Sequence, residues 1–243
     1  MLQRWLVDHV RTMVADTPYR PPTPGERTEA IAALRAVLAG ESNDPRATSG
    51  VDDAGGPFTM LEATEHGWGT VILRPVSDVV IEVPHPGSDR FTARLGLELF
   101  HTIPSAALLV AGAHRRAGDS AADVAHRTDS LFHAYAQTLA LPEIQLHGFA
   151  ADTAPDTDAV VSPGAGEQGE LHRRVEKALR QHGFRVGHHE RLAGRTNVQG
   201  IAAAAERRPF LHLELAPLLR IHRDVVVDAV AKAVADTRDQ QGD

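Results

Sequence analysis

The stretch Val-Ser-Asp-Val-Val-Ile-Glu-Val-Pro-His-Pro-Gly-Ser-Asp, from Val76 to Asp89, decides the fold of this chain. Its first half is rich in β-branched residues and stops at Pro84, which is typical of a buried strand. Its second half is a polar turn, and residues 89–101 then place apolar side chains at helical spacing. A buried strand that runs through a polar turn into a helix is the repeating unit of an α/β fold.

The same alternation continues on both sides of this stretch. Apolar or alternating runs predict strands at 58–63, 69–73, 106–111, 143–149, 159–162, 184–186 and 210–214. Apolar residues at helical spacing predict helices at 26–39, 119–139, 170–182 and 223–236. We therefore expect an α/β fold with a mixed, mainly parallel sheet flanked by helices.

The N-terminal region differs in character from the rest of the chain. The segment Pro-Tyr-Arg-Pro-Pro-Thr-Pro-Gly at 18–25 separates a short first helix from the helix at 26–39. Residues 41–56 are rich in Ser, Asp, Gly and Pro, which indicates a surface loop. We expect residues 1–50 to form a helical appendage and residues 51–243 to form the α/β domain.

The composition narrows the chemistry. The 243 residues include 14 His and no Cys, so any metal must be held by His, Asp or Glu. The 32 Asp and Glu residues outnumber the 25 Lys and Arg residues, and 5% of the residues are aromatic. Nucleic-acid binding needs clustered cations and stacking platforms, so we expect no nucleic-acid partner.

Membrane attachment and export are not predicted either. The longest apolar run, 103–113, is broken by Pro104 and Ser105 and falls short of the roughly 18 residues of a membrane span. The apolar run at the start of the chain carries charged residues, unlike a signal peptide. We expect a cytoplasmic protein without a membrane partner, and the sequence leaves the oligomeric state open.

Polar side chains follow several predicted strands, at the ends where α/β sheets form their sites. They are His85 and Asp89, then His114, Arg115 and Arg116, then His147, and finally His212 and Glu214. A buried ionisable group must be paired or must bind a metal. Two His and one carboxylate match the ligand set of a catalytic zinc, which keeps its fourth position for water. Glu214 could deprotonate such a water and later protonate the leaving group.

The segment His-Pro-Gly-Ser-Asp-Arg-Phe-Thr, residues 85–92, resembles the signature of the zinc-dependent poly-γ-glutamate hydrolases and the related N-formylglutamate amidohydrolases. These enzymes share the metallocarboxypeptidase-like fold. Gln-Leu-His-Gly, residues 145–148, is similar to the strand of the family's later histidine ligand. The resemblance covers roughly residues 78–235. It implies a zinc site and a general base made of these residues: His85, Asp89 and His147 for the metal, and Glu214 for the base.

Asp89 departs from the family pattern. The hydrolases typically have Glu five residues after the first histidine, whereas this Asp lies four residues after His85. Asp is shorter by one methylene, so the loop must come closer to the metal. Asp89 could instead cap the following helix. The alternatives for a ligand are then Glu82, His114 and Asp123, and His212 is a further candidate because it shares a strand face with Glu214.

Four polar residues are predicted to bind a substrate carboxylate. An Arg fork holds a carboxylate through two parallel hydrogen bonds. Arg115 and Arg116 follow a predicted strand, and Arg195 and Asn197 lie in the Gly-bounded loop 194–200 before a short helix. A solvated Arg pair and a helix-capping Asn are the alternative interpretations.

Asp123, His126 and Arg127 lie on one side of the predicted helix 119–139. They could orient a ligand histidine from behind. A solvated helix face is the alternative.

The resemblance implies cleavage of an amide bond in a small-molecule or γ-linked peptide substrate that carries a carboxylate, such as a γ-glutamyl or N-acyl amino acid. A non-catalytic small-ligand binding module on the same fold is the alternative function. Esterase or deacylase activity would use the same water, and the sequence does not distinguish these activities from amide hydrolysis. The chain has no Gly-x-Ser-x-Gly, Walker-type or His-Glu-x-x-His motif.

Overall fold

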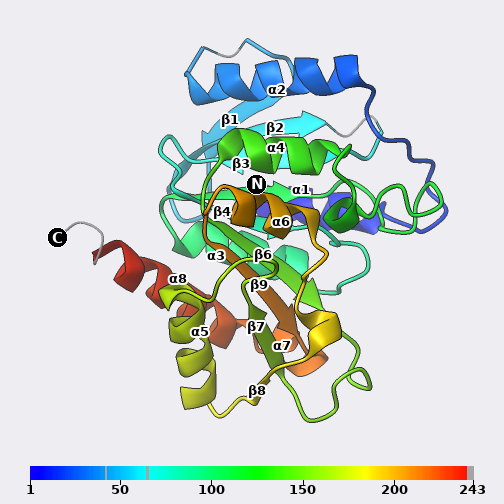
Figure 1. The fold of residues 1–243 in the computed structure, drawn as a ribbon. Coiled ribbons are helices and arrows are strands. Elements are labelled where there is room, and N and C mark those ends of the chain that lie inside the picture. Colours follow the sequence, from blue (N-terminus) through cyan, green and yellow to red (C-terminus); the bar gives the residue numbers. More distant parts are fainter. Residues whose placement is uncertain (42, 64–65, 240–243) are drawn as a thin grey trace.

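The computed structural model describes residues 1–41, 43–63 and 66–239. Within these residues, nine strands form one sheet (Figure 1). In the order in which they lie in the sheet, the strands are β1 (Ala47–Val51), β2 (Pro57–Ala63), β3 (Gly69–Leu73), β5 (Ala106–Val110), β4 (Val79–Val83), β6 (Glu143–Gly148), β9 (Phe210–Leu215), β7 (Ala159–Ser162) and β8 (Val186–Gly187).

The centre of the sheet is parallel and most of its margins are antiparallel. Strands β5, β4, β6 and β9 run parallel to their neighbours in this series. Strands β1, β2, β3 and β5 pair antiparallel in turn, as do β9 and β7. The carboxyl ends of β4, β6 and β9 therefore lie side by side at one edge. The predicted α/β fold with a mixed sheet flanked by helices is confirmed.

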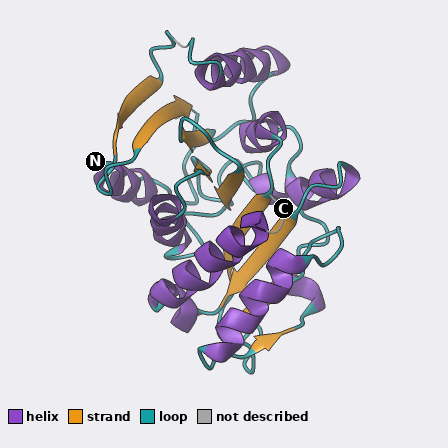
Figure 2. Ribbon diagram, turned by 90° about the vertical axis from the view of Figure 1, so that its left-hand side faces the viewer, coloured by secondary structure: helices purple, strands orange, loops and turns teal. Residues whose placement is uncertain are grey.

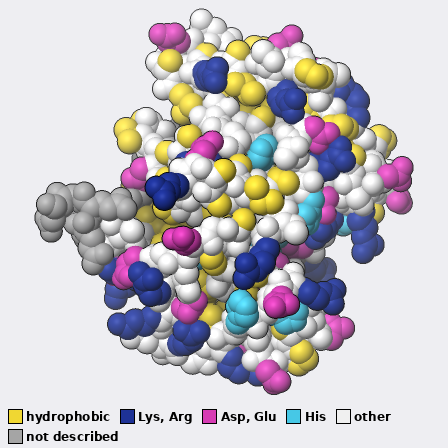
Figure 3. Space-filling model, in the orientation of Figure 1, with side chains coloured by type: hydrophobic (Ala, Val, Ile, Leu, Met, Phe, Trp, Pro, Cys, Tyr) yellow, Lys and Arg dark blue, Asp and Glu magenta, His cyan; other side chains and the backbone are white. Residues whose placement is uncertain are grey.

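Helices cover both faces of the sheet (Figure 2). α3 contacts β4 and β5 in one layer, and α4 contacts β3 and β5 in the other. The first layer contains α1 (Leu2–Arg11), α3 (Thr92–Thr102), α5 (Glu170–Gln181) and α8 (Arg223–Asp239). The second layer contains α2 (Pro24–Leu38), α4 (Leu131–Leu139) and α6 (Val198–Ala205). The short helix α7 (Pro217–Ile221) follows β9. None of the helices in the described part of the chain is long and apolar enough to cross a membrane. Acidic and basic side chains are interspersed on the face seen in Figure 3.

The strands divide their side chains between two hydrophobic cores. On β4, Val79, Ile81 and Val83 lie in the core beneath α3, whereas Val80 lies in the core beneath α4. Because successive side chains of a strand point to opposite faces, Glu82 points toward the α4 side. Ile144 and Leu146 of β6 and Leu211, Leu213 and Leu215 of β9 lie in the same core as the residues beneath α3. The polar residues of these two strands face the α4 side: Glu143, Gln145 and His147 on β6, and His212 and Glu214 on β9.

Residues 1–50, predicted to be a helical appendage, pack onto the same sheet as the rest of the chain. Leu2 and Leu6 of α1 lie in the core beneath α3, and Leu34 of α2 lies in the core beneath α4. The predicted surface loop 41–56 contains the edge strand β1, which pairs with β2. β1 has exposed or half-exposed side chains and no apolar alternation, so the sequence does not indicate it.

The predicted helix 119–139 is wrong in its first half. Residues 118–120 have left-handed backbones, with φ between 55° and 68°, which a right-handed helix does not accommodate. A single 3-10 turn, η1 (Val124–His126), follows, and α4 begins only after Ser130, whose side chain caps it. Asp123 therefore lies in an irregular loop and not on a helix.

Gly96 lets α3 lie close to β4. A Cβ at Gly96 would meet Val83 Cγ2 at 2.6 Å and Leu108 Cδ1 at 3.2 Å. We expect Gly96→Ala to lower the free energy of unfolding by about 1–3 kcal/mol, because the core must shift to accept a methyl group. Gly25→Ala is the matched control, since Gly25 in the first turn of α2 has open space around it. Urea unfolding measures both variants, and equal losses in the two would contradict the packing argument.

Candidate metal centre

The loop between β4 and α3 carries His85 and Asp89. The Asp89 N–H donates to the His85 carbonyl at 2.9 Å, and the Thr92 hydroxyl donates to the Asp89 carbonyl at 2.7 Å. These bonds fold the loop so that the side chains of His85 and Asp89 approach each other. α3 begins at Thr92, with Phe91 at the N-cap in a left-handed conformation and without a side-chain cap. Asp89 therefore does not cap α3, and its carboxylate turns toward the histidines.

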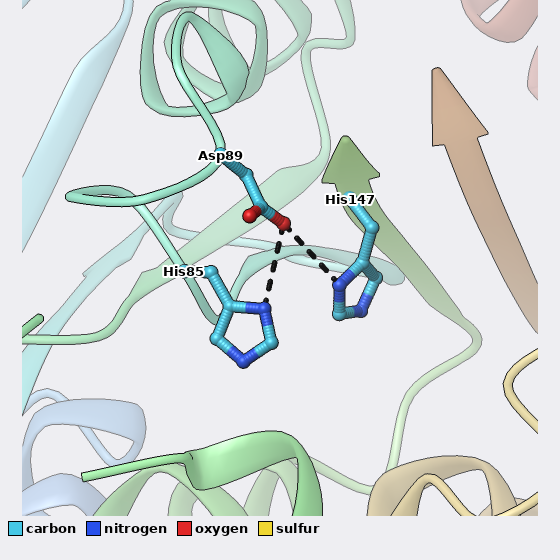
Figure 4. A group of neighbouring side chains, drawn as sticks. All are labelled: His85, Asp89 and His147. Atoms are coloured by element: carbon cyan, nitrogen blue, oxygen red, sulfur yellow. Dashed lines mark ion pairs between the residues drawn. The ribbon is translucent and has the colours of Figure 1, made fainter. Parts of the chain in front are cut away.

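His85, Asp89 and His147 converge at the carboxyl end of the parallel strands (Figure 4). Asp89 Oδ2 lies 3.4 Å from His85 Nδ1 and 3.6 Å from His147 Nδ1. The two imidazole rings have centroids 5.0 Å apart and planes inclined by 70°. The exposed fractions of His85, Asp89 and His147 are 1%, 7% and 5%. Three ligand-type atoms thus face one another in a site shielded from bulk water.

Each histidine is held by a partner on its other ring nitrogen. His85 Nε2 lies 2.8 Å from Asp123 Oδ1, and His147 Nε2 lies 2.7 Å from Gln145 Oε1. Because carboxylate and amide oxygens accept hydrogen bonds, both Nε2 atoms carry the proton. When a ring is neutral, its Nδ1 therefore presents a lone pair toward Asp89. Metal-ligating histidines are commonly oriented by such partners.

The donor set fits a divalent metal such as zinc. Bonds of about 2.0–2.2 Å in tetrahedral geometry separate neighbouring ligand atoms by roughly 3.3–3.6 Å. The two measured separations from Asp89 Oδ2, 3.4 Å and 3.6 Å, agree with this range. The same oxygen also accepts the Gly148 N–H at 3.1 Å, which fixes its position. When both rings are neutral, two nitrogen lone pairs face a carboxylate oxygen, and a cation between them stabilises this arrangement.

Burial and neighbouring charges shift the pKa values of the three residues. Burial favours the neutral form of Asp89, but contacts with His147 and His85 outweigh it and hold the pKa of Asp89 well below its usual range. Burial lowers the pKa of His147 to about 4. Burial also acts to lower the pKa of His85, but Asp123 and Asp89 more than offset it, so the pKa is raised. At neutral pH Asp89 is ionised and His147 is neutral, the states that bind metal.

Glu214 lies on β9 next to the three donors. It is the register partner of His147 in the parallel ladder between β6 and β9. Burial, with a further contribution from Asp89, raises the pKa of Glu214 to about 8. Its Oε2 has no hydrogen-bond partner within the described part of the chain. An unpaired carboxyl oxygen with a raised pKa is suited to proton transfer.

His212 forms a second group of possible ligands with His147 and Glu214. Their ligand atoms lie within 4.8 Å of one another, and the His212 and His147 rings stack with centroids 4.5 Å apart. His212 Nδ1 has no partner among the described residues. His147 is common to both groups, and its Nε2 is already bonded to Gln145. Its free Nδ1 faces Asp89, which favours the group with His85 and Asp89 as the metal site.

A cleft of about 700 Å³ opens onto Asp89. Its walls come from the loops after β4 and β5: Gly87, Ser88, Asp89, Arg90, His114, Arg115, Arg116, Ser120 and Asp123. Arg115 Nη2 donates to Asp123 Oδ2 at 2.7 Å, so part of its guanidinium is already engaged. Arg116 is exposed and its side chain forms no ion pair with the described residues. Both predicted arginines of this loop thus lie at the cleft.

Arg195 and Asn197 are not among the described residues that line this cleft. Arg195 is exposed. Asn197 is 2% exposed, and its Oδ1 accepts the Gly200 N–H at 3.0 Å, which caps α6. Its amide nitrogen donates to Gln145 Oε1 in the interior. The side chain of Asn197 is therefore committed to internal hydrogen bonds.

Two residues near the site have no assigned role in the sequence interpretation. Gln145 is buried and accepts a hydrogen bond from His147. The sequence could have indicated this contact, because residues two positions apart on a strand share a face. Arg220 of α7 donates to the Arg90 carbonyl at 2.9 Å and to the Phe149 carbonyl at 3.0 Å. Arg220 thus fastens the loops after β4 and β6 to each other, and no local motif indicates this role.

The comparisons with known proteins agree with this architecture. No model of a protein family matches the chain, and no curated protein matches it. The fold is shared with a solved hydrolase of the kind that the resemblance names. Among solved structures, a bacteriophage poly-gamma-glutamate hydrolase is similar, with a TM-score of 0.53 and 14% identity over 85% of this chain and 97% of that chain.

Two further solved structures are less similar. An N-formylglutamate amidohydrolase from Ralstonia eutropha JMP134 has a TM-score of 0.43 and 16% identity over 67% of this chain and 95% of that chain. A metallo-carboxypeptidase from Burkholderia cenocepacia has a TM-score of 0.46 and 11% identity over 91% of this chain and 70% of that chain. The likeness to the poly-gamma-glutamate hydrolase, at 14% identity, shows a common fold and does not assign an activity.

The raised pKa of Glu214 predicts a pH dependence of stability in the metal-free protein. Between the ordinary pKa of 4.5 and about 8, Glu214 is ionised in the unfolded chain and protonated in the folded protein. The unfolded state then binds fewer protons, so this residue makes the free energy of unfolding fall as pH rises through that window. Glu214→Gln removes the contribution and should show a smaller decline. Urea unfolding of chelator-treated proteins measures the difference, and parallel pH curves for the two proteins would contradict it.

Proposed function

We propose that this protein is a zinc-dependent hydrolase that cleaves an amide bond in a carboxylate-bearing substrate, such as a γ-glutamyl or N-acyl amino acid. The convergence of His85 Nδ1, Asp89 Oδ2 and His147 Nδ1 carries the proposal. Two imidazoles and one carboxylate leave a fourth position open, as catalytic zinc sites do. The similar fold of a poly-gamma-glutamate hydrolase supports the same class of chemistry.

Each residue of the site has a distinct role in this proposal. His85, Asp89 and His147 would hold the zinc, which supplies a Lewis acid for the substrate carbonyl. Glu214 Oε2, which lacks a partner in the described structure, takes the proton of the attacking water. The same oxygen returns that proton to the leaving nitrogen. A positive charge at the three donors favours the ionised form of Glu214, the form that acts as the base.

The charge of the cleft supports an acidic substrate. Arg90, Arg115 and Arg116 line it together with His114. Arg115 is partly neutralised by Asp123, whereas Arg116 can turn its guanidinium toward a ligand. Guanidinium groups bind carboxylates through paired hydrogen bonds, so Arg116 is our choice for the substrate carboxylate.

Three variants should distinguish the residues that bind zinc from the residue that transfers the proton. His85→Ala and His147→Ala each remove one ligand and should lose bound zinc. Glu214→Gln keeps all three ligands, so it should retain zinc and lose about 100- to 10,000-fold in turnover. Elemental analysis of the purified proteins and hydrolysis assays with γ-glutamyl and N-formyl amino acids measure the two properties.

The outcomes of this experiment distinguish the possible functions. Near-stoichiometric zinc in both histidine variants would overturn the ligand assignment. Zinc binding by the wild-type protein without hydrolysis of any amide or ester substrate would identify a non-catalytic binding module. Hydrolysis of esters but not of amides would replace amidase by esterase activity. Asp89→Asn keeps the size of the acidic ligand and removes its charge, so its zinc loss tests that ligand separately.

Arg116→Gln and Arg195→Gln form a matched pair that tests carboxylate binding. Arg116 lines the cleft and Arg195 does not, although both are exposed cations. Loss of a charged hydrogen bond costs about 1.5–3 kcal/mol, so Arg116→Gln should raise KM for an acidic substrate about tenfold or more. Arg195→Gln should leave KM unchanged. An equal effect of both changes would point to general electrostatic attraction instead of a specific contact.

A further inference from the structure

We propose that Asn197 and Gln145 are positioning residues that fix the protonation pattern of the His147 ring. They hold the proton on Nε2 and leave Nδ1 free for the metal. This inference rests on the proposed function only in that it takes His147 as a ligand. Asn197 lies 50 residues beyond His147 at the start of α6, and its role was predicted to be substrate binding.

Gln145 is the centre of a buried polar network on the α4 side of the sheet. Its side chain has no exposed surface. Gln145 Oε1 accepts from His147 Nε2 at 2.7 Å and from the Asn197 amide nitrogen. Gln145 Nε2 donates to Glu82 Oε2 at 2.7 Å and to Gln199 Oε1 at 3.3 Å. All four hydrogen-bonding positions of the Gln145 amide are therefore used.

The orientation of the Gln145 amide follows from two backbone groups. Asn197 Oδ1 accepts the Gly200 N–H at 3.0 Å, and a backbone N–H can only donate. Asn197 must therefore present its NH₂ group to Gln145. Gln199 Nε2 donates to the Val124 carbonyl at 3.0 Å, and a carbonyl can only accept. Gln199 must therefore present its oxygen to Gln145.

Both anchors require the same orientation of Gln145. Its oxygen must face Asn197 and its NH₂ group must face Gln199 and Glu82. The reversed amide would place two oxygens together on the Gln199 side and two NH₂ groups together on the Asn197 side. The N-cap of α6 and the 3-10 turn η1 thus set which way the amide group of Gln145 is turned, in the centre of the sheet.

The orientation of the Gln145 amide group decides the tautomer of His147. An oxygen opposite His147 Nε2 requires the proton on that nitrogen. A neutral imidazole carries one proton, so Nδ1 is a lone pair directed at Asp89 Oδ2, 3.6 Å away. The opposite tautomer would put a proton on Nδ1, in the position of the metal. Without Gln145 and Asn197, part of the apo protein would have to change tautomer before binding.

A pair of substitutions at Gln145 separates this role from packing. Gln145→Met keeps the length of the side chain and removes the acceptor. Gln145→Glu keeps an acceptor oxygen for both His147 and Asn197, and a proton on its second oxygen can replace the bond that the amide donates to Glu82 Oε2. Asn197→Ser is the second test, because Ser also caps a helix but does not donate to Gln145. Two measurements apply to each protein: the tautomer of His147 in the metal-free state, by ¹⁵N NMR of the imidazole, and zinc affinity, by competition with a chromophoric chelator.

We expect the wild-type protein and Gln145→Glu to hold the His147 proton on Nε2 in the metal-free state. Gln145→Met and Asn197→Ser should show a mixture of tautomers. Substitution of a residue that orients a metal ligand typically weakens affinity about 10- to 100-fold, and we expect losses of that order in these two variants. Gln145→Glu should bind zinc nearly as well as the wild-type protein.

Three results would overturn the proposal. They are an unchanged tautomer in both Gln145→Met and Asn197→Ser, wild-type zinc affinity in both, and an affinity in Gln145→Glu as low as in Gln145→Met. The last result would show that an acceptor oxygen at this position is not what supports zinc binding. The tautomer is read in the metal-free protein, so it does not depend on catalysis. A wild-type protein with the expected tautomer pattern but no hydrolytic activity would contradict the proposed function and leave this inference standing.

Discussion

The parallel strands at the centre of the sheet bury polar side chains on one face, and the desolvation of these groups constrains everything packed over them. The opposite face of the same strands is apolar and lies beneath α3. On the polar face, Glu82, Gln145 and His212 have almost no exposed surface. A buried polar group without a partner destabilises the fold by about 1–3 kcal/mol, so the elements above this face must supply donors and acceptors. The start of α6 supplies them to Gln145 through Asn197 and Gln199, and the turn η1 anchors Gln199 through the Val124 carbonyl.

The same constraint locates the reactive part of the molecule. Deep in the sheet, the amide of Gln145 is fully hydrogen-bonded. Pairing is incomplete on the neighbouring strand: His212 Nδ1, at the level of Gln145, and Glu214 Oε2, nearer the carboxyl end of β9, lack partners in the described part of the chain. His85 and His147 leave their Nδ1 atoms facing Asp89. Other buried oxygens of this face, Glu82 Oε1 and Glu143 Oε2, also lack a partner among the described residues, but Glu214 Oε2 lies beside the histidine Nδ1 atoms, where a cation and a water could satisfy it.

Much of the fold follows from local sequence patterns. The strand 76–83 and the helix after it were predicted from periodicity, and the structure contains β4 (Val79–Val83) and α3 (Thr92–Thr102). The errors have physical causes. β1 is an edge strand with little burial, so it leaves no apolar pattern. The helix predicted at 119–139 has apolar residues at suitable spacing, but the left-handed backbone at 118–120 and the cap at Ser130 confine the helix to its second half.

The candidate site was predictable only in part, because local patterns show which residues follow a strand but do not show contacts between distant segments. Positions at strand ends singled out His85, Asp89, His147 and Glu214, and the structure brings these four residues together, although their roles stay predictions. The substrate-binding prediction for Asn197 came from its polar, Gly-bounded loop. That interpretation missed the buried amide of Gln145, because the hydrogen bond joins segments 52 residues apart.

The sequence by itself determined which residues share a strand face and which follow a strand, because the pleat of a strand and the turn of a helix fix these relations within a few residues. The sequence therefore determined that Gln145 and His147 share one face of their strand, and that His212 and Glu214 share one face of theirs. The tertiary structure decided which of the 14 histidines meet and which ring nitrogen each one presents. Those properties depend on the order of the strands and on partners such as Asp123 and Asn197, whose distance from the ligands in space is unrelated to their distance along the chain.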